Sequence, residues 1–214
     1  MGRPKTYDRD AIARKAMDLF WLHGFHATST EALVAHMGVN RFSLYAEFGT
    51  KQGLYEAALA IYEREIATRY LGPLEAPDAG LTQVLALIRF FASRAGEPGS
   101  EYGCLLCNTA TERAPHDVPS AQAFGDYVTR LSSALRHALE GARDRGELRQ
   151  GVSCADESLF LATSLLGFFV MLRARVAPDR VQAAARAAIA HLEELAVLSR
   201  RVRTQTEPPD AAQR

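Results

Sequence analysis

The sequence has little of what marks secreted or membrane-spanning proteins. Its three cysteines, Cys104, Cys107 and Cys154, are too few and too unevenly spaced for a disulfide framework, which fits a reducing compartment. No apolar run follows the N-terminal residues, and no stretch reaches the roughly 18 uninterrupted apolar residues of a membrane span. These absences predict a soluble, cytoplasmic protein that has no membrane partner.

Signatures of catalysis are missing as well. The chain has no glycine-rich phosphate loop and no nucleophile elbow. A zinc site is weakly supported, because Cys104 and Cys107 have no second pair of ligands and His116 alone does not complete one. We therefore expect a protein that is not an enzyme and that holds neither a metal nor a cofactor.

Helical periodicity is what the sequence does contain, with no alternating or β-branched stretch that indicates a strand. We expect an all-α fold of about nine helices: an N-terminal three-helix domain, residues 1–55, a C-terminal helical domain, residues 56–203, and a disordered tail, residues 204–214. The stretch GPLEAPDAG, residues 72–80, follows the fourth helix and, with two prolines and two glycines, is the best candidate for a domain boundary. The expected helices beyond it span 81–95, 102–114, 119–145, 155–175 and 179–201.

Two short helices follow one another closely near the N-terminus. The first opens with Thr28 and Glu31 at capping-box spacing and ends at Gly38. The second is capped by Asn40 and stops at Gly49. Two short helices joined by about four residues that include a glycine are typical of a helix-turn-helix.

The second of these helices has two different faces. At 100° per residue, Leu44 and Phe48 share the face that turns inward. The outward face carries a guanidinium, hydroxyls and aromatic rings, from Arg41, Phe42, Ser43 and Tyr45. Such groups suit the major groove, where arginine binds guanine, serine several base edges and phenylalanine the thymine methyl. The pattern alone leaves open a small helical subdomain with ordinary surface polarity.

The run TSTEALVAHMGVNRFSLYAEFGTKQGLYEAAL resembles the DNA-binding signature of the TetR/AcrR family of bacterial transcriptional regulators. The match covers about residues 8–60 and combines a threonine-serine cap, a Gly-Val turn, Ser-Leu-Tyr, Phe-Gly and the following lysine. The resemblance implies a helix-turn-helix repressor in the cytoplasm. The alternative from another class is a helical small-molecule-binding protein or enzyme without DNA binding.

The resemblance also implies which side chains contact DNA. Thr28 and Ser29 would contact phosphate, and Lys51 would anchor a phosphate at the start of the fourth helix. The groove-facing set would be Asn40, Arg41, Phe42, Ser43 and Tyr45. Two positions depart from the family pattern, because Phe42 replaces a small residue and Glu47 replaces histidine or tyrosine.

The net charge of the chain is zero, but residues 1–55 hold seven lysines and arginines against five acidic residues. Arg3 and Lys5 lie together on an N-terminal arm that we expect to be flexible and to contact DNA. The small excess of positive charge is in keeping with a double-stranded DNA partner and does not establish one.

A homodimer is expected, because one helix-turn-helix makes few contacts and two copies bind a palindromic operator through half-sites about 34–36 Å apart. Residues 159–172, LFLATSLLGFFVML, are apolar nearly all round and are expected to be buried on most sides. With the last helix and their symmetry mates they would form a four-helix interface, as the resemblance also implies. The alternative is that both helices belong to the core of one chain.

Residues 103–114 hold the remaining chemistry. Cys104 and Cys107 are three positions apart, on one face of an expected helix, as a structural pair or as a redox-sensing pair. The run GCLLCNTATE also resembles a motif in a TetR/AcrR branch that includes electrophile- and oxidant-sensing repressors, with Cys104 at the sensing position. We predict that oxidation or alkylation of Cys104, or a small apolar effector, weakens DNA binding. The predicted effector residues are Cys104, Cys107, Asn108, Phe90, Phe124, Tyr127 and Phe168, with Phe91 and Phe169 nearby.

Overall fold

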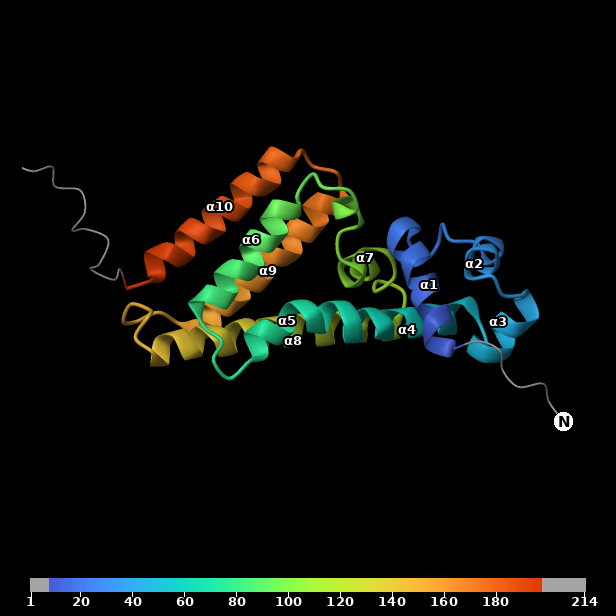
Figure 1. Cartoon of the computed structure of the whole chain (residues 1–214), viewed down its shortest axis with the longest axis horizontal. Coiled ribbons are helices and arrows are strands. Elements are labelled where there is room, and N and C mark those ends of the chain that lie inside the picture. Colours follow the sequence, from blue (N-terminus) through green and yellow to red (C-terminus); the bar gives the residue numbers. More distant parts are fainter. Residues whose placement is uncertain (1–7, 198–214) are drawn as a thin grey trace, which may run out of the picture.

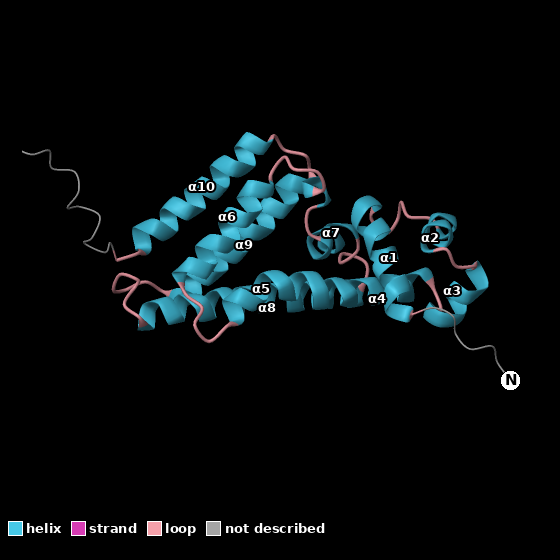
Figure 2. Ribbon diagram, in the orientation of Figure 1, coloured by secondary structure: helices cyan, strands magenta, loops and turns pink. Residues whose placement is uncertain are grey.

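The computed structural model describes residues 8–197, and every regular element in this part of the chain is helical (Figure 2). The α-helices are α1 (Arg9–His23), α2 (Thr30–Met37), α3 (Arg41–Phe48), α4 (Lys51–Tyr62), α5 (Thr68–Glu75), α6 (Leu81–Arg94), α7 (Leu105–Glu112), α8 (Val118–Asp144), α9 (Cys154–Arg173) and α10 (Pro178–Leu195). The π-helical turn η1 (Glu63–Ala67) joins α4 to α5, and the 3-10 turn η2 (Ser100–Tyr102) precedes α7. Counted with α4, η1 and α5 as one rod, these α-helices number about nine, and the predicted all-α fold is confirmed.

The molecule is elongated, and α1, α2 and α3 lie at one end of it (Figure 1). The rod of α4, η1 and α5 runs from this end along the molecule beside α8, while α6, α9 and α10 pack together toward the other end (Figure 1). α1 packs on α4, and α8 packs on α9. α7 contacts α1, α4, α8 and α9, so it lies at the junction between the two ends.

Side-chain caps begin the helices of the first end. The Asp8, Asn40 and Thr50 side chains accept the backbone N–H groups of Asp10, Ser43 and Gly53, and the cap at Asn40 is confirmed as predicted. The predicted capping box of Thr28 and Glu31 is wrong. The cap of α2 is Ser29, whose hydroxyl accepts the N–H of Ala32, because the Thr28 hydroxyl is turned inward and donates to the Gly24 carbonyl at 2.5 Å.

Several predicted boundaries also need correction. The fourth helix does not end before residue 72 but runs through Gly72 and Pro73 to Glu75, because a proline close to a helix end leaves few backbone hydrogen bonds unmade. α10 ends at Leu195 rather than near residue 201. Its last carbonyl accepts the N–H of Arg149, and the N–H of Val197 donates to Glu147, so the chain pairs with the α8–α9 loop. The predicted tail 204–214 lies outside the described residues.

α9 is less deeply buried than its sequence suggests. In the single chain Leu159, Phe160 and Val170 are 57%, 47% and 50% exposed, so the chain's own core buries only part of residues 159–172. Burial of the remaining side by a second copy stays a prediction. The opposite side, which includes Leu161 and Leu165, is buried in the core. By length and composition α9 could cross a bilayer, a property that it shares with core helices of soluble proteins.

Candidate nucleic-acid interface and cavity

α3 is held by two inward side chains and exposes its other face. Leu44 and Phe48 are 1% and 7% exposed, as the sequence predicts, while Phe42 on the outer face is 84% exposed. An eight-residue helix is marginal on its own, so this docking and the Asn40 cap keep it folded. A large apolar side chain exposed beside Arg41 has no packing role in the described chain and is available to a partner.

The outward side chains of α3 are linked to the start of α2. The Arg41 guanidinium lies 3.1 Å from a Glu31 carboxylate oxygen and 5.7 Å from the centre of the Tyr45 ring. The Tyr45 hydroxyl lies 3.3 Å from the Thr30 hydroxyl. Hydrogen bonds with Thr30 and then Arg41 lower the pKa of Tyr45. Arginine, tyrosine and the α2 N-terminus therefore form one polar surface.

The residues predicted to contact phosphate differ in how far they are buried. Ser29 is exposed at the start of α2, but the Thr28 side chain is buried and its hydroxyl is already bonded, so it does not reach this surface. Lys51 is half-buried with its ammonium 4.3 Å from the centre of the Phe25 ring, and burial lowers its pKa. Arg3 and Lys5 lie outside the described residues.

Glu47, the acidic departure from the family pattern, has a partner within the chain. Its carboxylate lies 3.4 Å from the Arg9 guanidinium, and its side chain is only 12% exposed. Arg9 in turn lies over the Phe48 ring at 5.0 Å. Glu47 therefore ties α3 to the start of α1, and Arg9 balances its charge.

A cavity opens at the middle of the molecule, among α1, the α4–α5 rod, α6, α8 and α9. It encloses about 110 Å³ of space open to water-sized molecules. Its walls are aromatic and aliphatic, with Arg94 at the rim: Trp21, Tyr62, Ala67, Tyr70, Leu71, Leu87, Phe90, Phe91, Arg94, Gly99, Ser100, Gly103, Tyr127, Leu131, Leu165, Phe169 and Leu172. Such an apolar hollow with a few polar groups is typical of a small-molecule site.

The predicted effector residues fall into two groups. Phe90 and Tyr127, with Phe91 and Phe169, line the cavity. The remaining predicted residues do not line it: Phe124, Phe168, Cys104, Cys107 and Asn108. The amide of Asn108 instead donates to the Tyr102 carbonyl at 3.0 Å.

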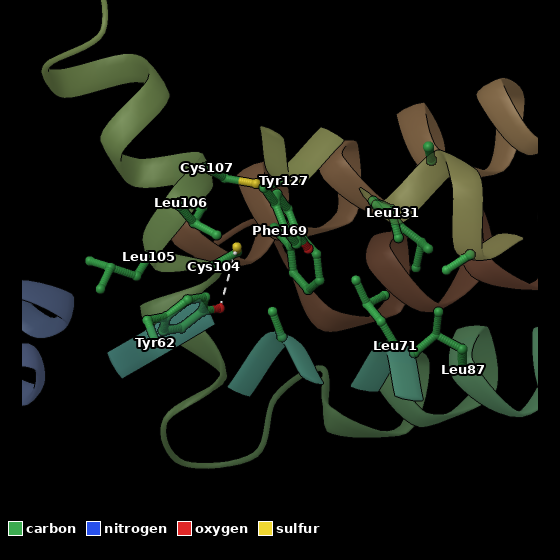
Figure 3. Close-up of a cluster of buried hydrophobic side chains, with 14 of the residues drawn as sticks. Tyr62, Leu71, Leu87, Cys104, Leu105, Leu106, Cys107, Tyr127, Leu131 and Phe169 are labelled. Atoms are coloured by element: carbon green, nitrogen blue, oxygen red, sulfur yellow. Dashed lines mark hydrogen bonds between the residues drawn. The ribbon is translucent and has the colours of Figure 1, made fainter. Parts of the chain in front are cut away.

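Cys104 lies behind the cavity wall rather than in it. It is the residue before α7, not part of the helix as predicted, and its thiol is 1% exposed. The Tyr62 hydroxyl points at the Cys104 sulfur and donates to it at 3.3 Å (Figure 3). Tyr62 and Tyr127 also line the cavity, so two tyrosines separate the thiol from any bound molecule.

The surroundings of Cys104 favour its thiolate. Burial on its own raises the pKa of the Cys104 thiol, but hydrogen bonds from the Cys107 thiol, the Tyr62 hydroxyl and the backbone N–H groups of Cys107 and Leu106 lower it to about 7. The same hydrogen bond with Cys104, followed by burial, raises the pKa of Cys107. Within the pair, the Cys104 sulfur is thus the hydrogen-bond acceptor and the Cys107 thiol is the donor.

Four side chains clamp the C-terminal end of α1 to the rest of the molecule, and sequence reasoning missed their contacts. The Trp21 indole donates to the Gly103 carbonyl at 3.1 Å. The Glu112 carboxylate accepts the N–H groups of Phe25 and His26 at 3.0 and 2.7 Å. The guanidinium of buried Arg113 lies 3.8 Å from the centre of the Phe25 ring, and Arg173 donates to the carbonyls of Trp21 and Leu22.

These clamp residues, Trp21, Glu112, Arg113 and Arg173, connect the cavity to the helix-turn-helix. Gly103 directly precedes Cys104, and Glu112 closes α7, so α7 is tied to α1 at both its ends. The run GCLLCNTATERA contains Glu112 and Arg113, but their partners lie more than eighty residues earlier in the chain. No local pattern predicts such a pairing.

Two family models match the chain. The model for bacterial regulatory proteins of the tetR family matches residues 12–58, which hold α1, α2, α3 and part of α4. The model for the tetracyclin repressor-like C-terminal domain matches residues 80–188, more than half of the chain. The two matches fall on the two ends of the molecule that Figure 1 shows.

Individual proteins are similar over most of the chain. An uncharacterized HTH-type transcriptional regulator of Bacillus subtilis (strain 168), YezE, is 28% identical over 183 residues, covering 85% of this chain and 94% of that protein. The HTH-type transcriptional repressor ComR of Escherichia coli (strain K12) is 37% identical over 142 residues, 65% of this chain and 62% of that protein. A cysteine mutant of the TetR family regulator CifR, solved with 26-bp double-strand operator DNA, is 29% identical with a TM-score of 0.75, covering 88% of this chain and 98% of that one.

Proposed function

The chain belongs to the tetR family of bacterial regulatory proteins, and from that premise we propose how it works as a DNA-binding transcriptional regulator. It is a regulator and not an enzyme. We propose that the protein represses transcription in the cytoplasm and leaves its operator when the cavity is filled or Cys104 is modified. The exposed set of Arg41, Phe42 and Tyr45 on a firmly docked α3 is the observation that carries the DNA-binding part.

We propose that α3 enters the major groove. Arg41 and Phe42 would read base edges, supported by Asn40, Ser43 and Tyr45. Ser29 and Lys51 would contact phosphates, with the N-terminal arm that carries Arg3 and Lys5. Thr28 would act indirectly, since its buried hydroxyl fixes the turn before α2. The DNA-binding domain would comprise residues 1–55 and the effector and dimerisation domain residues 56–203, divided within the continuous α4–α5 rod.

We propose a homodimer that binds a palindromic operator. The exposed apolar side chains of α9, Leu159, Phe160 and Val170, form a stripe that water would otherwise cover. α10 lies beside α9 and exposes alanines, which permit close approach of another helix. α9 and α10 of two copies would form a four-helix interface. CifR, in its complex with double-strand operator DNA, supports DNA as the ligand of the other end.

We propose that release from DNA starts at the wall formed by Tyr62 and Tyr127. A molecule in the cavity displaces these rings, and a modified Cys104 does so from the other side, because both rings contact both sites. α7 and the clamp would carry the shift to α1. The effector must favour a dimer whose α3 helices no longer match the half-site spacing, since a ligand shifts an equilibrium only by its differential affinity.

The DNA-binding part is tested by titrating the protein with DNA from upstream of its own gene at several salt concentrations. We expect one palindromic segment to bind more tightly than random DNA, with log affinity falling linearly as log salt rises. Arg41→Ala should cost about 1–3 kcal/mol for the operator, while Lys51→Ala should mainly reduce the salt slope by about 1. Arg136→Ala removes an equal charge from α8 and is the control. Equal affinity for all sequences would contradict the proposal.

A further inference from the structure

The cavity holds one unbalanced charge at its rim. Arg94 is the only charged side chain among the cavity-lining residues, and it is exposed, so it lies where the cavity meets solvent. No carboxylate of residues 8–197 lies within ion-pair distance of it. Arg89, on the same helix, is paired with Glu193 at 3.0 Å. A cation that has no internal partner beside an apolar hollow is a fitting contact for an anionic group.

We propose that the cavity takes a small carboxylate with an aromatic or short aliphatic body, bound by its carboxylate to Arg94. The guanidinium offers two parallel N–H donors that match the two oxygens of a carboxylate. The hydroxyl of Ser100, another lining residue, makes no hydrogen bond within the described chain and adds a donor at the same rim. This inference rests on the proposed function, because it names the chemistry of the effector.

The body of the ligand would lie among aromatic rings. Phe90 and Phe91 lie 5.3 Å apart, and Phe91 meets Phe169 edge-on at 4.7 Å. Tyr70 contacts both Phe90 and Phe91 at 5.2 Å. Rings packed in this way offer faces and edges to a flat apolar ligand. The cavity volume of about 110 Å³ is several times the roughly 10–15 Å³ that admits one water, so the cavity has room for a small ligand such as benzoate.

Two acidic residues lie near the rim but do not line the cavity. Glu97 and Glu101 line a neighbouring hollow, together with Arg175, rather than the cavity. Neither carboxylate forms an ion pair with Arg94. Neutral molecules of the same shape would gain the apolar contacts but not the ion pair, so the charge of the ligand separates this proposal from a purely apolar site.

The test uses the intrinsic fluorescence of Trp21, which is the single tryptophan of the chain and lines the cavity. The full-length protein, free of DNA, is titrated with benzoate, phenylacetate and hexanoate, and with the matching alcohols and amides. We expect at least one carboxylate to bind about tenfold or more tightly than its neutral partners, because a charge-assisted bidentate pair is stronger than a neutral hydrogen bond. Arg94→Gln should reduce this preference to less than about twofold. Arg89→Gln is the matched control and should leave it unchanged.

Three results would overturn the proposal. The first is equal binding of the acids and their neutral partners, and the second is a preference for acids that survives Arg94→Gln. The third is the absence of saturable carboxylate binding up to about 10 mM, which is weaker than the roughly millimolar range of simple site binding. Operator affinity is then measured with and without the bound carboxylate. Charge-selective binding that leaves operator affinity unchanged would contradict the release mechanism and still support the carboxylate site. Operator release by a neutral effector alone would support the release mechanism and overturn the carboxylate site.

Discussion

The DNA-reading end and the cavity are built from different kinds of interaction. α2 and α3 are eight residues each, and each is fixed by a cap at its own first turn and by a few inward side chains. The cavity takes its walls from α1, the α4–α5 rod, α6, η2, α8 and α9, so it exists only when the whole chain is folded. One end is specified by neighbours in sequence and the other by neighbours in space.

The two ends therefore differ in which of their side chains can be substituted without loss of the fold. On the proposed groove-reading surface, a side chain such as Phe42, which is 84% exposed, can be replaced without disturbing the fold. The cavity walls also support the core, since Leu71, Leu131 and Leu165 are at most 2% exposed. Variation in ligand chemistry is therefore easiest at its rim, where Arg94 and Ser100 are not packed inside the core.

Truncating one buried leucine at each end gives the largest expected effect. Leu44 and Leu131 are both 1% exposed, and replacing either by alanine should lower the free energy of unfolding by about 2–5 kcal/mol. Leu44→Ala should also abolish operator binding, because α3 loses one of its two inward anchors, whereas Leu131→Ala should retain it. Urea unfolding and operator titration measure the two effects. If both variants lose the operator equally, α3 is not the independently docked element described above.

The sequence predicts the DNA-reading end well because its signals are local. The cap at Asn40 and the inward pair of α3 follow from short spacings, and both are confirmed. The cap of α2 was misassigned to Thr28, since two adjacent hydroxyl residues fit the same pattern and only the fold decides which one turns inward.

The cavity was predicted only in part, because its walls come from residues that are far apart in the sequence. Aromatic residues of the second domain suggest a pocket, but which ones face it depends on helix rotations that arise from long-range packing. Phe169 lines the cavity and its neighbour Phe168 does not. Arg94 and the clamp carry no local signature, and the exposed stripe of α9 looked like core because composition does not distinguish a chain's own core from a surface left for another copy.

The clamp joins the two ends, and weakening it should separate ligand binding from DNA release. Glu112→Gln keeps the shape of the side chain but replaces an acceptor oxygen by a donor facing the N–H groups of Phe25 and His26. We expect Glu112→Gln to lose most of the coupling free energy between effector and operator, which is typically about 1–3 kcal/mol. The measurement compares operator affinity with and without a bound effector. Glu101→Gln makes the same chemical change at a carboxylate that lines the neighbouring hollow and does not belong to the clamp residues, and it is the control.

Unchanged coupling in Glu112→Gln, with normal operator and effector affinities, would show that the signal does not depend on the Glu112 hydrogen bonds. The contacts of Trp21, Arg113 and Arg173 would remain as connections, and so would the α4–α5 rod, which runs from the DNA-reading end to Tyr62 and Ala67 in the cavity wall. The π-helical turn between them is the point at which that rod departs from regular geometry.

The smallest expected effect lies in the wall between the cavity and Cys104. The pKa of Cys104, about 7, predicts that its alkylation rate rises between about pH 6 and pH 8 as the thiolate forms. Tyr62→Phe removes one of several hydrogen bonds to that thiolate, so the pKa rises and the rate profile moves to higher pH. Iodoacetamide labelling of Cys104 in a Cys154→Ser background, followed by mass spectrometry, measures the midpoint.

The midpoint is the informative quantity, because Cys104 is 1% exposed and the absolute rate also depends on how often the wall opens. Leu71→Val, which alters a cavity-lining residue that is not a hydrogen-bond donor to Cys104, is the control: it should change the rate and leave the midpoint in place. A midpoint that stays near pH 7 in Tyr62→Phe would assign the thiolate to the Cys107 thiol and the backbone N–H groups of α7. The cavity and the thiol would then be two separate inputs to α7, and a bound carboxylate would alter operator affinity without changing the reactivity of Cys104.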